Sequence, residues 1–541
     1  MVVESQEIFK EFKEHSVAEF FKKNRQMLGY SGPIKSLTTT VHELVTNGLD
    51  ACEAAGVAPD IYVKVEKLGT DHMRLIVEDN GPGIPKKFVG KALGTMLAGT
   101  KFHKFRQSRG QQGIGGAGVV MYSQITTGKP ARIVTGTGEG KVFETHLSVD
   151  TKTNQPILTD EKEYSGKMRG TRIEVELKGV LYQKGEQSPD EYLRRTALAN
   201  PHAKLTYIDP DNLTTVYDRA VSKIPPIPKE SQPHPKGLET DDILSYARTA
   251  SARSVKSFLE TSFARMSAQK AKEIESRVSF DMNKRPQDLQ WNEAEEIVKA
   301  IREMTFIAPP ADCLVPISED HLEKALKNVL QPEFFKVITR PPAVYRGGVP
   351  FIVEVSVAYG GKSGKAINAE DPTSERMEIM RFANRTPLLF DAGGCALTKG
   401  VQSIEWKRYD IKADVPITVL VNFTSVYVPY TGAGKQAVAD EEEIIKEIRL
   451  ALMDTGRQVG RYVSGQRKRY EREAKKKMLL RYVEPVAEAI ADLTGANVKL
   501  AEKKLLHVVE TKYSEFNEEA EGGDESNGSE ENGNGKQEED D

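Results

Sequence analysis

The sequence predicts an α/β protein with several domains. Its 541 residues are enough for roughly three or four domains of ordinary size. Two patterns indicate mixed α/β structure: apolar residues recur at helical spacing over residues 34–55, and short apolar runs bounded by turn residues, such as Met73–Val77, are typical of buried strands. A Pro-rich connector at 224–235 ends this first region, and a second α/β unit begins near Pro309.

Composition favours a protein without a membrane segment. Apolar residues make up 38% and charged residues 29% of the chain, and no apolar stretch approaches the roughly 18 residues that a membrane span needs. The N-terminal segment lacks the apolar core of a signal peptide. The three cysteines, Cys52, Cys313 and Cys395, are too scattered for a disulfide framework or a metal site, so we expect a reducing, cytoplasmic location.

The net charge of −3 conceals an uneven distribution. The tail 515–541 holds twelve acidic residues against Lys536 alone, so it carries −11 and the remainder of the chain +8. This tail is poor in apolar residues and rich in Gly, Asn and Ser, so we expect it to be disordered. The mildly basic remainder is compatible with nucleic-acid binding, but an excess of this size is not diagnostic.

The predicted helix over 34–55 carries three polar residues on one face. Glu43, Asn47 and Asp50 are spaced i, i+4 and i+7, which aligns them on a helix. A carboxylate can hold and deprotonate a water, and an amide oxygen suits Mg²⁺, which takes few protein ligands and keeps phosphates and waters. We therefore interpret Glu43 as a general base, Asn47 as a Mg²⁺ ligand and Asp50 as a further nucleotide contact. An ordinary solvated helix face is the alternative.

A second motif, Asp79-Asn80-Gly81-Pro82-Gly83-Ile84, follows the predicted strand at Met73–Val77. Its two glycines allow the backbone to turn sharply and to approach a ligand closely. A carboxylate at the end of that strand can accept a hydrogen bond from an exocyclic amine such as that of adenine. We assign Asp79 as an adenine contact and Gly83 as a point of close approach, with an ordinary turn as the alternative.

A glycine-rich segment at 109–118, RGQQGIGGAG, is a candidate phosphate cradle. Its glycines leave backbone N–H groups free to face anionic oxygens, and a helix can begin at Val119–Gln124. A flexible loop is the alternative, because the segment fits neither GxGxxG after a strand nor GxxxxGK[ST]. The preceding polar and basic segment 99–108 could form a mobile lid. The candidate phosphate contacts are Thr100, Lys101, Arg109, Gly110, Gln111, Gln112, Gly113, Ile114, Gly115 and Gly116.

These motifs occur in a specific order: a helix with E-x-x-x-N, then D-x-G-x-G, then the glycine-rich segment, then a strand with the pair Gly170-Thr171. This order resembles the ATPase superfamily of gyrase, heat-shock chaperones, histidine kinases and MutL. The resemblance implies a Bergerat-type α/β sandwich that binds ATP with Mg²⁺. It also implies residue roles: Glu43 as the base for the attacking water, Asn47 as the Mg²⁺ ligand, Asp79, Gly83 and Thr171 at the adenine, and 110–116 as the triphosphate-binding lid.

Consecutive short helices are predicted after the Pro-rich connector, at 241–250, 251–263, 267–278 and 291–304, with serines and Asn292 as N-caps. They resemble a helix-two-turns-helix insertion. Such modules often touch DNA, and basic side chains here offer charge for phosphates. A plain structural spacer is an equally good interpretation. The candidate phosphate contacts are Arg248, Arg253, Lys256 and Arg265.

A second α/β unit follows these helices. One helix and four strands are predicted in it, at 318–330, 351–357, 377–383, 388–390 and 417–426. The segment Thr431–Gln436 is not a Walker loop, because Pro429 and Gln436 stand where that motif needs Gly and Ser or Thr. In the type II topoisomerase and MutL branches of the resembled superfamily, a transducer domain supplies such a loop lysine to the γ-phosphate. Lys435 resembles it, with an exposed surface lysine as the alternative.

A long helix is predicted from about Asp440 to Tyr482. Its segment 457–481 holds ten Lys or Arg residues against Glu471 and Glu473. This stalk could follow a DNA backbone or meet an acidic partner, and a solvated charged face is the alternative.

Two further segments are candidates for binding. The basic and aromatic cluster Trp406-Lys407-Arg408-Tyr409 could contact DNA or simply pack at a strand edge. After Pro485, the amphipathic segments 486–493 and 498–513 are expected to dock on another subunit or to fold back on this chain.

The order of ATPase domain, helical insertion and transducer resembles the B-subunit family of archaeal-type DNA topoisomerase VI over about residues 5–510. The resemblance implies prokaryotic, nucleoid-associated A₂B₂ heterotetramers: ATP binding dimerises the B subunits around one DNA duplex, and a separate A subunit cleaves another. Gly48 is a departure, because Ser or Ala is usual there. A chaperone-like or DNA-scaffold ATP clamp without strand passage is the alternative. The implied domains are 1–228 (ATPase), 229–308 (helix-two-turns-helix), 309–484 (transducer with stalk), 485–514 (C-terminal helices) and 515–541 (acidic tail).

Overall fold

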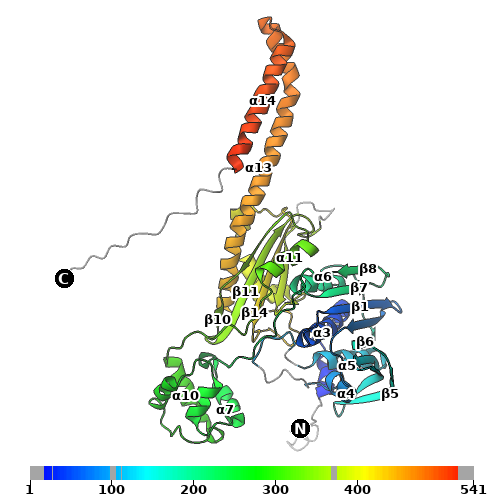
Figure 1. Cartoon of the computed structure of the whole chain (residues 1–541), viewed down its shortest axis with the longest axis vertical. Helices are drawn as coiled ribbons and strands as arrows, with labels where there is room; N and C mark the ends of the chain where they lie inside the picture. Colours follow the sequence, from blue (N-terminus) through cyan, green and yellow to red (C-terminus); the bar gives the residue numbers. More distant parts are fainter. Residues whose placement is uncertain (1–16, 27, 98–104, 111–112, 367–374, 522–541) are drawn as a thin grey trace, which may run out of the picture. The chain divides into compact units, whose positions relative to one another are not determined.

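The computed structural model describes residues 17–26, 28–97, 105–110, 113–366 and 375–521. The chain forms two compact units, Met1–Val459 and Gly460–Asp541. The first unit contains two β-sheets and a helical segment, and the second is helical in its described part (Figure 1). No helix within the described residues is long and apolar enough to cross a membrane.

The first sheet has eight strands in the order β5-β4-β3-β6-β2-β1-β7-β8. Neighbouring strands are antiparallel except β1 and β7, which are parallel. The strand predicted at Met73–Val77 forms the middle of β2. The strands are β1 (Asp60–Lys67), β2 (His72–Asp79), β3 (Ala131–Thr137), β4 (Lys141–Asp150), β5 (Gln155–Ser165), β6 (Arg169–Lys178), β7 (Lys204–Ile208) and β8 (Thr214–Tyr217).

Helices cover one face of this sheet (Figure 1). Buried and partly exposed residues alternate along β1 and β6, as expected when one face of a sheet packs and the other meets water. On the open face, Arg132 of β3 pairs with Glu144 of β4 at 2.9 Å and with Glu174 of β6 at 2.8 Å. The result is the predicted α/β sandwich. The helices are α2 (Val17–Asn24), α3 (Pro33–Ala54), α4 (Lys86–Gly94), α5 (Gly115–Thr127) and α6 (Pro189–Ala199).

Helix α3 confirms the helix predicted over 34–55, and its packing explains Gly48. Pro33 stands at the start of the helix, where its missing N–H is harmless. A Cβ atom at Gly48 would lie 3.1 Å from Asp79 Cβ and 3.1 Å from Ile61 Cδ1. A mid-helix glycine costs about 1 kcal/mol relative to alanine. The helix tolerates this cost because the absence of a side chain at position 48 lets α3 pack directly against the end of β2, where Asp79 lies.

Glycines also set the strand ends around Asp79. Gly170 has φ +123°, and a Cβ there would lie 1.9 Å from the carbonyl oxygen of Asp79. Gly83 has φ +72°, and its Cβ would lie 2.1 Å from the carbonyl oxygen of Gly136. Backbone therefore packs on backbone between β2, β3 and β6, which no residue with a side chain permits. The glycine at position 83 is explained by this contact, and its approach to a ligand stays a prediction.

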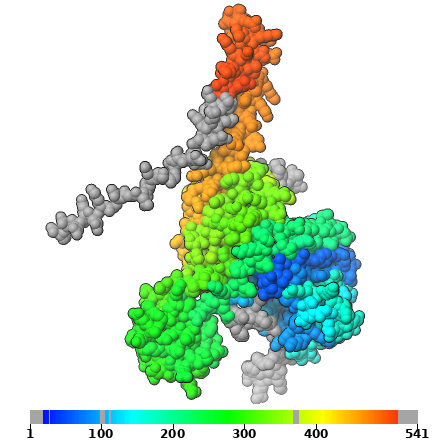
Figure 2. All heavy atoms as spheres, in the orientation of Figure 1, coloured from blue at the N-terminus to red at the C-terminus, as the bar shows by residue number. Residues whose placement is uncertain are grey.

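The helical segment between 235 and 304 has a hydrophobic core of its own and forms a rounded body (Figure 2). Ser254 and Ser267 cap their helices through hydrogen bonds to Ser257 N and Lys270 N, as predicted. Asn292 is not a cap. The N-cap is Gln290, the residue before the last helix, and it forms a capping box with Glu293 in the first turn of that helix. The elements are η1 (Pro235–Gly237), α7 (Thr240–Thr249), α8 (Val255–Ser262), α9 (Ala268–Glu275), η2 (Pro286–Asp288) and α10 (Trp291–Glu303).

The second sheet has six strands in the order β10-β11-β14-β12-β13, with β9 paired to β11. Residues 388–390, predicted as a strand, are not one, because the chain turns at Asn384-Arg385 and only Thr386–Pro387 pairs with β12. Strands β9 and β10 were not predicted. The elements are α11 (Glu319–Val329), β9 (Phe334–Thr339), β10 (Ala343–Tyr345), β11 (Val349–Tyr359), β12 (Glu378–Ala383), β13 (Thr386–Pro387), η3 (Ala392–Gly394), α12 (Ala396–Gln402), η4 (Trp406–Tyr409) and β14 (Ile417–Ser425).

The two sheets share one continuous hydrophobic core. Helix α11 of the second sheet packs on α6 of the first. Beside this contact, Arg194 and Arg195 of α6 pair with the buried Glu378 of β12 at 2.5 and 3.3 Å. The domain boundaries near 228 and 309 stay predictions, but the structure joins the flanking domains by apolar and ionic contacts.

The C-terminal helices differ from the prediction at Pro485. Helix α13 (Glu442–Thr494) continues through this proline instead of ending before it. Pro485 is exposed, so water can hydrogen-bond to the carbonyl group that loses its partner. Helix α14 (Val498–Glu521) extends into the acidic tail, so the first residues of that tail are helical rather than disordered. Residues 522–541 lie outside the described residues.

Candidate ATP site

Helices α3 and α5 bring the predicted base and the predicted metal ligand to the start of α5. A Cβ atom on Gly115, the first residue of α5, would lie 2.0 Å from Glu43 Oε2. A Cβ atom on Gly116 would lie 3.6 Å from Asn47 Nδ2. Glu43 is half-buried and Asn47 is exposed. The carboxylate and the amide therefore flank the N-terminus of α5, and a side chain at position 115 would displace the end of the Glu43 side chain.

The N-terminus of α5 is suited to an anion. No side chain caps it at Ile114, and the first turn closes where Gly118 N donates to Ile114 O at 2.6 Å. The preceding N–H groups have no intrahelical partner, and the helix dipole favours negative charge there. One backbone hydrogen bond holds the segment before the helix: Leu97 N donates to Gly113 O at 3.0 Å. Four predicted phosphate contacts, Thr100, Lys101, Gln111 and Gln112, lie outside the described residues.

Asp79 lies at the end of β2, half-buried beside α3. Its Oδ1 accepts a hydrogen bond from Gly81 N at 2.9 Å. Burial raises the pKa of Asp79 to about 6, although hydrogen bonds from the backbone of Gly81 and Thr171 act in the opposite direction. Thr171 is paired with Asp79 in the β2–β6 register, and its hydroxyl lies 3.2 Å from that of Thr135. The structure thus brings Asp79 and Thr171 together, as the adenine assignment requires.

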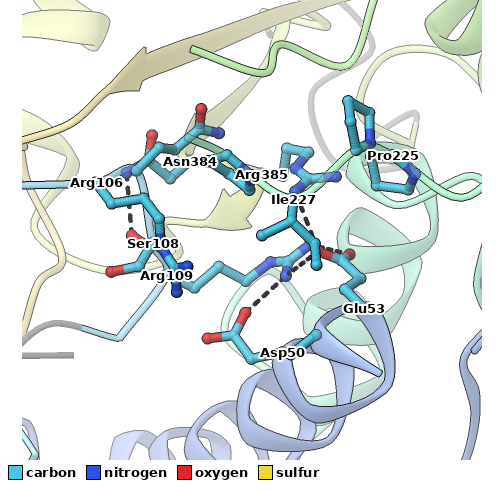
Figure 3. Close-up of a pocket in the computed structure, with 13 residues that line it drawn as sticks. Asp50, Glu53, Arg106, Ser108, Arg109, Pro225, Ile227, Asn384 and Arg385 are labelled. Carbon is cyan, nitrogen blue, oxygen red and sulfur yellow. Dashed lines mark hydrogen bonds and ion pairs between the residues drawn. The ribbon is translucent and has the colours of Figure 1, made fainter. Parts of the chain in front are cut away.

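Two predicted nucleotide contacts, Asp50 and Arg109, form an ion pair with each other. Arg109 is buried, and its Nη1 lies 2.7 Å from Asp50 Oδ1 while its Nη2 lies 2.7 Å from Glu53 Oε1 (Figure 3). Glu53 Oε2 also accepts a hydrogen bond from Arg385 Nη2 at 3.1 Å, and Glu53 Oε1 one from His202 Nε2 at 2.8 Å. We call these five side chains the interdomain ion cluster. The side chains of Asp50 and Arg109 are thus engaged in this cluster, and their contact with the nucleotide stays a prediction.

The pKa values in the interdomain ion cluster follow from burial and mutual charge. Burial alone would raise the pKa of Glu53, but Arg109 and Arg385 bring it well below its usual range. Burial and the charge of Arg109 lower the pKa of Arg385 to about 10. Burial also lowers the pKa of His202 and outweighs the hydrogen bond and charge of Glu53, which raise it, while the charges of Arg385 and Arg109 add to the lowering. His202 is therefore neutral near pH 7 and donates its Nε2–H to Glu53.

The segment just before the glycine-rich loop is held by the loop before α11 and by the turn after β12. Gln107 Nε2 donates to Val315 O at 2.9 Å, and Val315 N donates to Gln107 Oε1. Asn384 Nδ2 donates to Ser108 O at 3.1 Å, beside the pocket of Figure 3. No pattern in the sequence indicated these contacts, nor the roles of Glu53 and Arg385, because none belongs to a motif and each partner is distant along the chain.

Lys435 lies on a loop that reaches α3. Arg381 anchors this loop by donating to Gln436 O at 3.3 Å and to Phe390 O at 2.9 Å. A Cβ atom on Gly29 would lie 4.0 Å from Gly434 Cα, so the loop approaches the turn before α3. Burial lowers the pKa of His42, and the charge of Lys435 lowers it further. The loop that carries Lys435, which follows β14, therefore lies close to the turn before the helix that carries Glu43.

The described residues contain no group of three or more His, Cys, Asp or Glu side chains suited to a metal ion. A metal at this site would rely on few protein ligands. The exposed amide of Asn47, next to the N-terminus of α5, fits Mg²⁺ that is held mainly by phosphates and water.

The candidate DNA contacts differ in availability. Lys407 and Arg408 are exposed, while Tyr409 packs against α13, where a Cβ atom on Gly456 would lie 3.2 Å from its ring. Arg253 is exposed, but Lys256 pairs with Glu275 at 2.6 Å, which offsets its charge. Arg265 donates to Ala308 O at 3.0 Å. Arg408 is exposed but pairs with Glu405, so Arg253 and Lys407 are the better placed for phosphates.

Comparison with known proteins agrees with this architecture. The family model "Histidine kinase-, DNA gyrase B-, and HSP90-like ATPase" matches residues 32–178, and "Topoisomerase VI B subunit, transducer" matches residues 309–477. The B subunit of type 2 DNA topoisomerase 6 from Thermococcus sibiricus is 43% identical, over 95% of this chain and 98% of that protein. The protein of the same name from Methanothermobacter thermautotrophicus is 45% identical, over 89% and 92%.

The chain belongs to the family of type 2 DNA topoisomerase 6 B subunits. Membership confirms the resemblance inferred from the motif order, the ATPase sandwich and the transducer domain. It also confirms the predicted function, an ATP-dependent subunit of a type II DNA topoisomerase. The residues that match the ATPase family model, 32–178, include α3–α5 and β1–β6, and those that match the transducer model, 309–477, include the second sheet.

The pKa of Asp79 predicts a pH-dependent affinity for ATP. With a pKa of about 6, the ionised fraction falls roughly fourfold between pH 7.5 and pH 5.5, and the charge-assisted acceptor is lost with it. Binding of a non-hydrolysable ATP analogue, measured by calorimetry, should weaken by roughly that factor. Because the phosphates of the analogue also titrate, Asp79→Asn is the control. An identical pH dependence in Asp79→Asn would contradict the assignment.

The neutral state of His202 predicts acid destabilisation. Its pKa is lowered in the folded chain from the ordinary 6.5, so below about pH 6.5 the unfolded chain binds more protons and stability falls as the pH falls. The thermal midpoint should therefore drop between pH 7.5 and pH 5.5, and drop less in His202→Gln. Asp79, with its raised pKa, acts in the opposite direction in both proteins and cancels in the comparison. An equal decrease of the thermal midpoint in the unchanged chain and in His202→Gln would exclude His202 as a source of the acid destabilisation.

Proposed function

We propose that this chain is the nucleotide-gated motor of a two-component topoisomerase, and that it works with a separate A-type subunit that cleaves DNA. The names of the relatives, which identify them as B subunits, support the existence of such a partner. In this proposal two copies of the chain dimerise on binding ATP and enclose one DNA duplex. The partner opens a second duplex, and the assembly is an A₂B₂ heterotetramer. The single observation that carries the proposal is the convergence of Glu43, Asn47 and the N-terminus of α5.

The proposed hydrolysis proceeds by in-line attack of water on the γ-phosphorus. Glu43 orients the water and accepts its proton, and the free N–H groups at the start of α5 stabilise the charge on the phosphate oxygens. Asp79 accepts a hydrogen bond from the adenine amine, with Thr171 beside it. When bound, Mg²⁺ would offset the charge of the phosphates, and Asn47 would hold it.

Lys435 is proposed to stabilise the γ-phosphate and to report its loss to the transducer. Its loop already lies near α3, and Arg381 fixes that loop from β12. The interdomain ion cluster supplies a second connection, because Arg385 follows β12 and Glu53 belongs to α3. Loss of the γ-phosphate would release the first connection and leave the second. The transducer can then change its position without separating from the ATPase domain.

DNA is proposed to contact exposed basic residues on two elements. Arg253 precedes α8 in the helical segment, and Lys407 and Arg408 lie on η4 of the transducer. These residues have the charge to meet phosphates without reading sequence. Trp406 and Tyr409 are half-buried and support η4 rather than extend from it.

Strand passage is the test of the proposed function. The chain, co-purified with an A-type cleavage subunit, should relax supercoiled DNA only when ATP is present. Glu43→Gln should abolish turnover, because the amide cannot accept the proton, while nucleotide-dependent dimerisation measured by sedimentation persists. Failure to relax DNA with any such partner, alongside normal ATP turnover, would favour a clamp without strand passage. Near-normal turnover in Glu43→Gln would remove Glu43 as the base.

Replacement of Lys435 tests the link to the transducer. In Lys435→Ala the affinity for a non-hydrolysable ATP analogue should change little, whereas kcat should fall by roughly 10- to 1,000-fold because the charge that stabilises the transferred phosphoryl group is lost. Lys399→Ala, which removes another transducer lysine that pairs with Asp440, is the matched control. An unchanged kcat and an unchanged dimer population in Lys435→Ala would contradict the role.

A further inference from the structure

Three polar side chains form a row across the middle strands of the first sheet. Asp79 of β2 is paired with Thr171 of β6, and Thr171 is paired with Thr135 of β3. Directly paired residues on neighbouring strands point to the same face of a sheet. Asp79 lies on the face that α3 covers, because a Cβ atom on Gly48 of α3 would lie 3.1 Å from Asp79 Cβ. All three side chains therefore lie on the face of the sheet that carries the candidate ATP site.

The hydroxyl group of Thr135 uses its full hydrogen-bonding capacity inside the protein. The side chain is 2% exposed, and its Oγ1 lies 2.8 Å from Ile84 N, 3.1 Å from Gly170 O and 3.2 Å from Thr171 Oγ1. A hydroxyl group has one proton to donate and two lone pairs that accept. Because an N–H only donates and a carbonyl only accepts, Ile84 N donates to Thr135, and Thr135 gives its proton to Gly170 O. The third contact is then satisfied only when the Thr171 hydroxyl donates to Thr135.

The direction of this hydrogen bond decides what Thr171 offers to a ligand. Its proton is directed at Thr135, so its oxygen presents only lone pairs to the site. The neighbouring Asp79 carboxylate is an acceptor too, and Gly81 N donates to its Oδ1 at 2.9 Å. Two adjacent acceptors match an exocyclic amino group, which has two protons to donate. A carbonyl oxygen in the same place would leave both acceptors without a donor, which is unfavourable in a buried site.

We propose that Thr135 is a positioning residue that fixes the Thr171 hydroxyl as an acceptor, and that it thereby sets the preference of the site for a 6-amino purine over a 6-oxo purine. Thr135 does not touch the nucleotide. Without its hydroxyl group, the hydroxyl of Thr171 is free to rotate and to donate to a 6-oxo group, so the discrimination between the two bases falls. This inference rests on the proposed place of Asp79 and Thr171 at the adenine.

Binding of ADP and IDP to the full chain, measured by calorimetry with Mg²⁺ present, tests the proposal. ADP has a 6-amino base and IDP a 6-oxo base, and neither carries the γ-phosphate that drives dimerisation in the proposed function. The unchanged chain should bind ADP more tightly than IDP. In Thr135→Val, which removes the hydroxyl group and keeps the branched shape, the ratio of the two dissociation constants should shift about fivefold toward IDP, as expected for roughly one hydrogen bond.

Two further variants are the controls. Thr135→Ser retains the hydroxyl group and should keep the ratio within about twofold of its value in the unchanged chain. Thr145→Val removes the hydroxyl group of another buried threonine, on β4, which donates to Thr159 O at 2.9 Å, and should leave the ratio unchanged. A general defect of folding weakens ADP and IDP alike and does not move the ratio. If Thr135→Val does not fold, Thr135→Cys, with a weakly hydrogen-bonding thiol, takes its place.

Four results would overturn the proposal: equal affinities for ADP and IDP in the unchanged chain, an unchanged ratio in Thr135→Val, loss of the preference in Thr135→Ser, or the same shift in Thr145→Val. Thr171→Val, measured in parallel, separates this inference from the adenine assignment. If Thr171→Val shifts the ratio and Thr135→Val does not, only the role of Thr135 fails. If Thr171→Val leaves the ratio unchanged, the place of Thr171 at the adenine fails, and the role of Thr135 fails with it.

Discussion

The buried contact between Arg109 and Glu53 is the interaction on which the first unit depends. Glu53 belongs to the helix that carries Glu43 and Asn47, and Arg109 begins the glycine-rich segment that leads to α5. Through Arg385 the same carboxylate also holds the transducer. Removing one partner from such a buried pair leaves an uncompensated charge and costs on the order of 3–5 kcal/mol. The same buried charges therefore fix both the position of the ATP site and the attachment of the transducer.

Hydrogen-bond capacity explains why the interdomain ion cluster is stable although it is buried. Glu53 accepts from three side chains and both of its oxygens are used. Asn200 adds a neutral link, since its Oδ1 accepts from Arg109 and its Nδ2 donates to Arg385 O. With two carboxylates, two guanidinium groups and a neutral histidine, the cluster has no net charge. Such a cluster fixes the geometry of several segments at once, but each member is intolerant of replacement.

The sequence was most informative where function requires a local motif. Glu43 and Asn47 share a helix, and Gly115 and Gly116 share one glycine-rich segment, so spacing alone made them candidates for the ATP site, and the structure brings the four residues together. Periodicity also identified α3, β2, β11 and β14. It could not reveal that Arg109 and Asp50 meet each other, because that contact depends on how α3 and the loop pack. For the same reason it could not anticipate Glu53 or Arg385, whose partners lie on other elements.

Local rules failed where tertiary context or solvent outweighed them. Pro485 does not end α13, because the exposed helix can leave one carbonyl group to water. Residues 388–390 are apolar, but they follow a turn at two residues with positive φ, Asn384 and Arg385, and do not join the sheet. Conversely, Gly48 looked like a defect of the helix until its neighbours were known. Its absent side chain is what allows the end of β2 to lie against α3.

The backbone of Lys435 is held in a left-handed conformation. Its φ of +51° costs a residue with a side chain about 1–2 kcal/mol. The loop keeps this conformation because Arg381 and the pairing of Tyr430 with Val438 hold its ends. Energy stored in this way is returned when the loop rearranges. A ligand that attracts the lysine ammonium therefore has to supply only part of the free energy needed to rearrange the loop. A tenfold preference for one arrangement of the loop corresponds to about 1.4 kcal/mol. The loop is therefore held in a conformation of higher energy, and in the proposed function a single phosphate group decides whether the loop keeps that conformation.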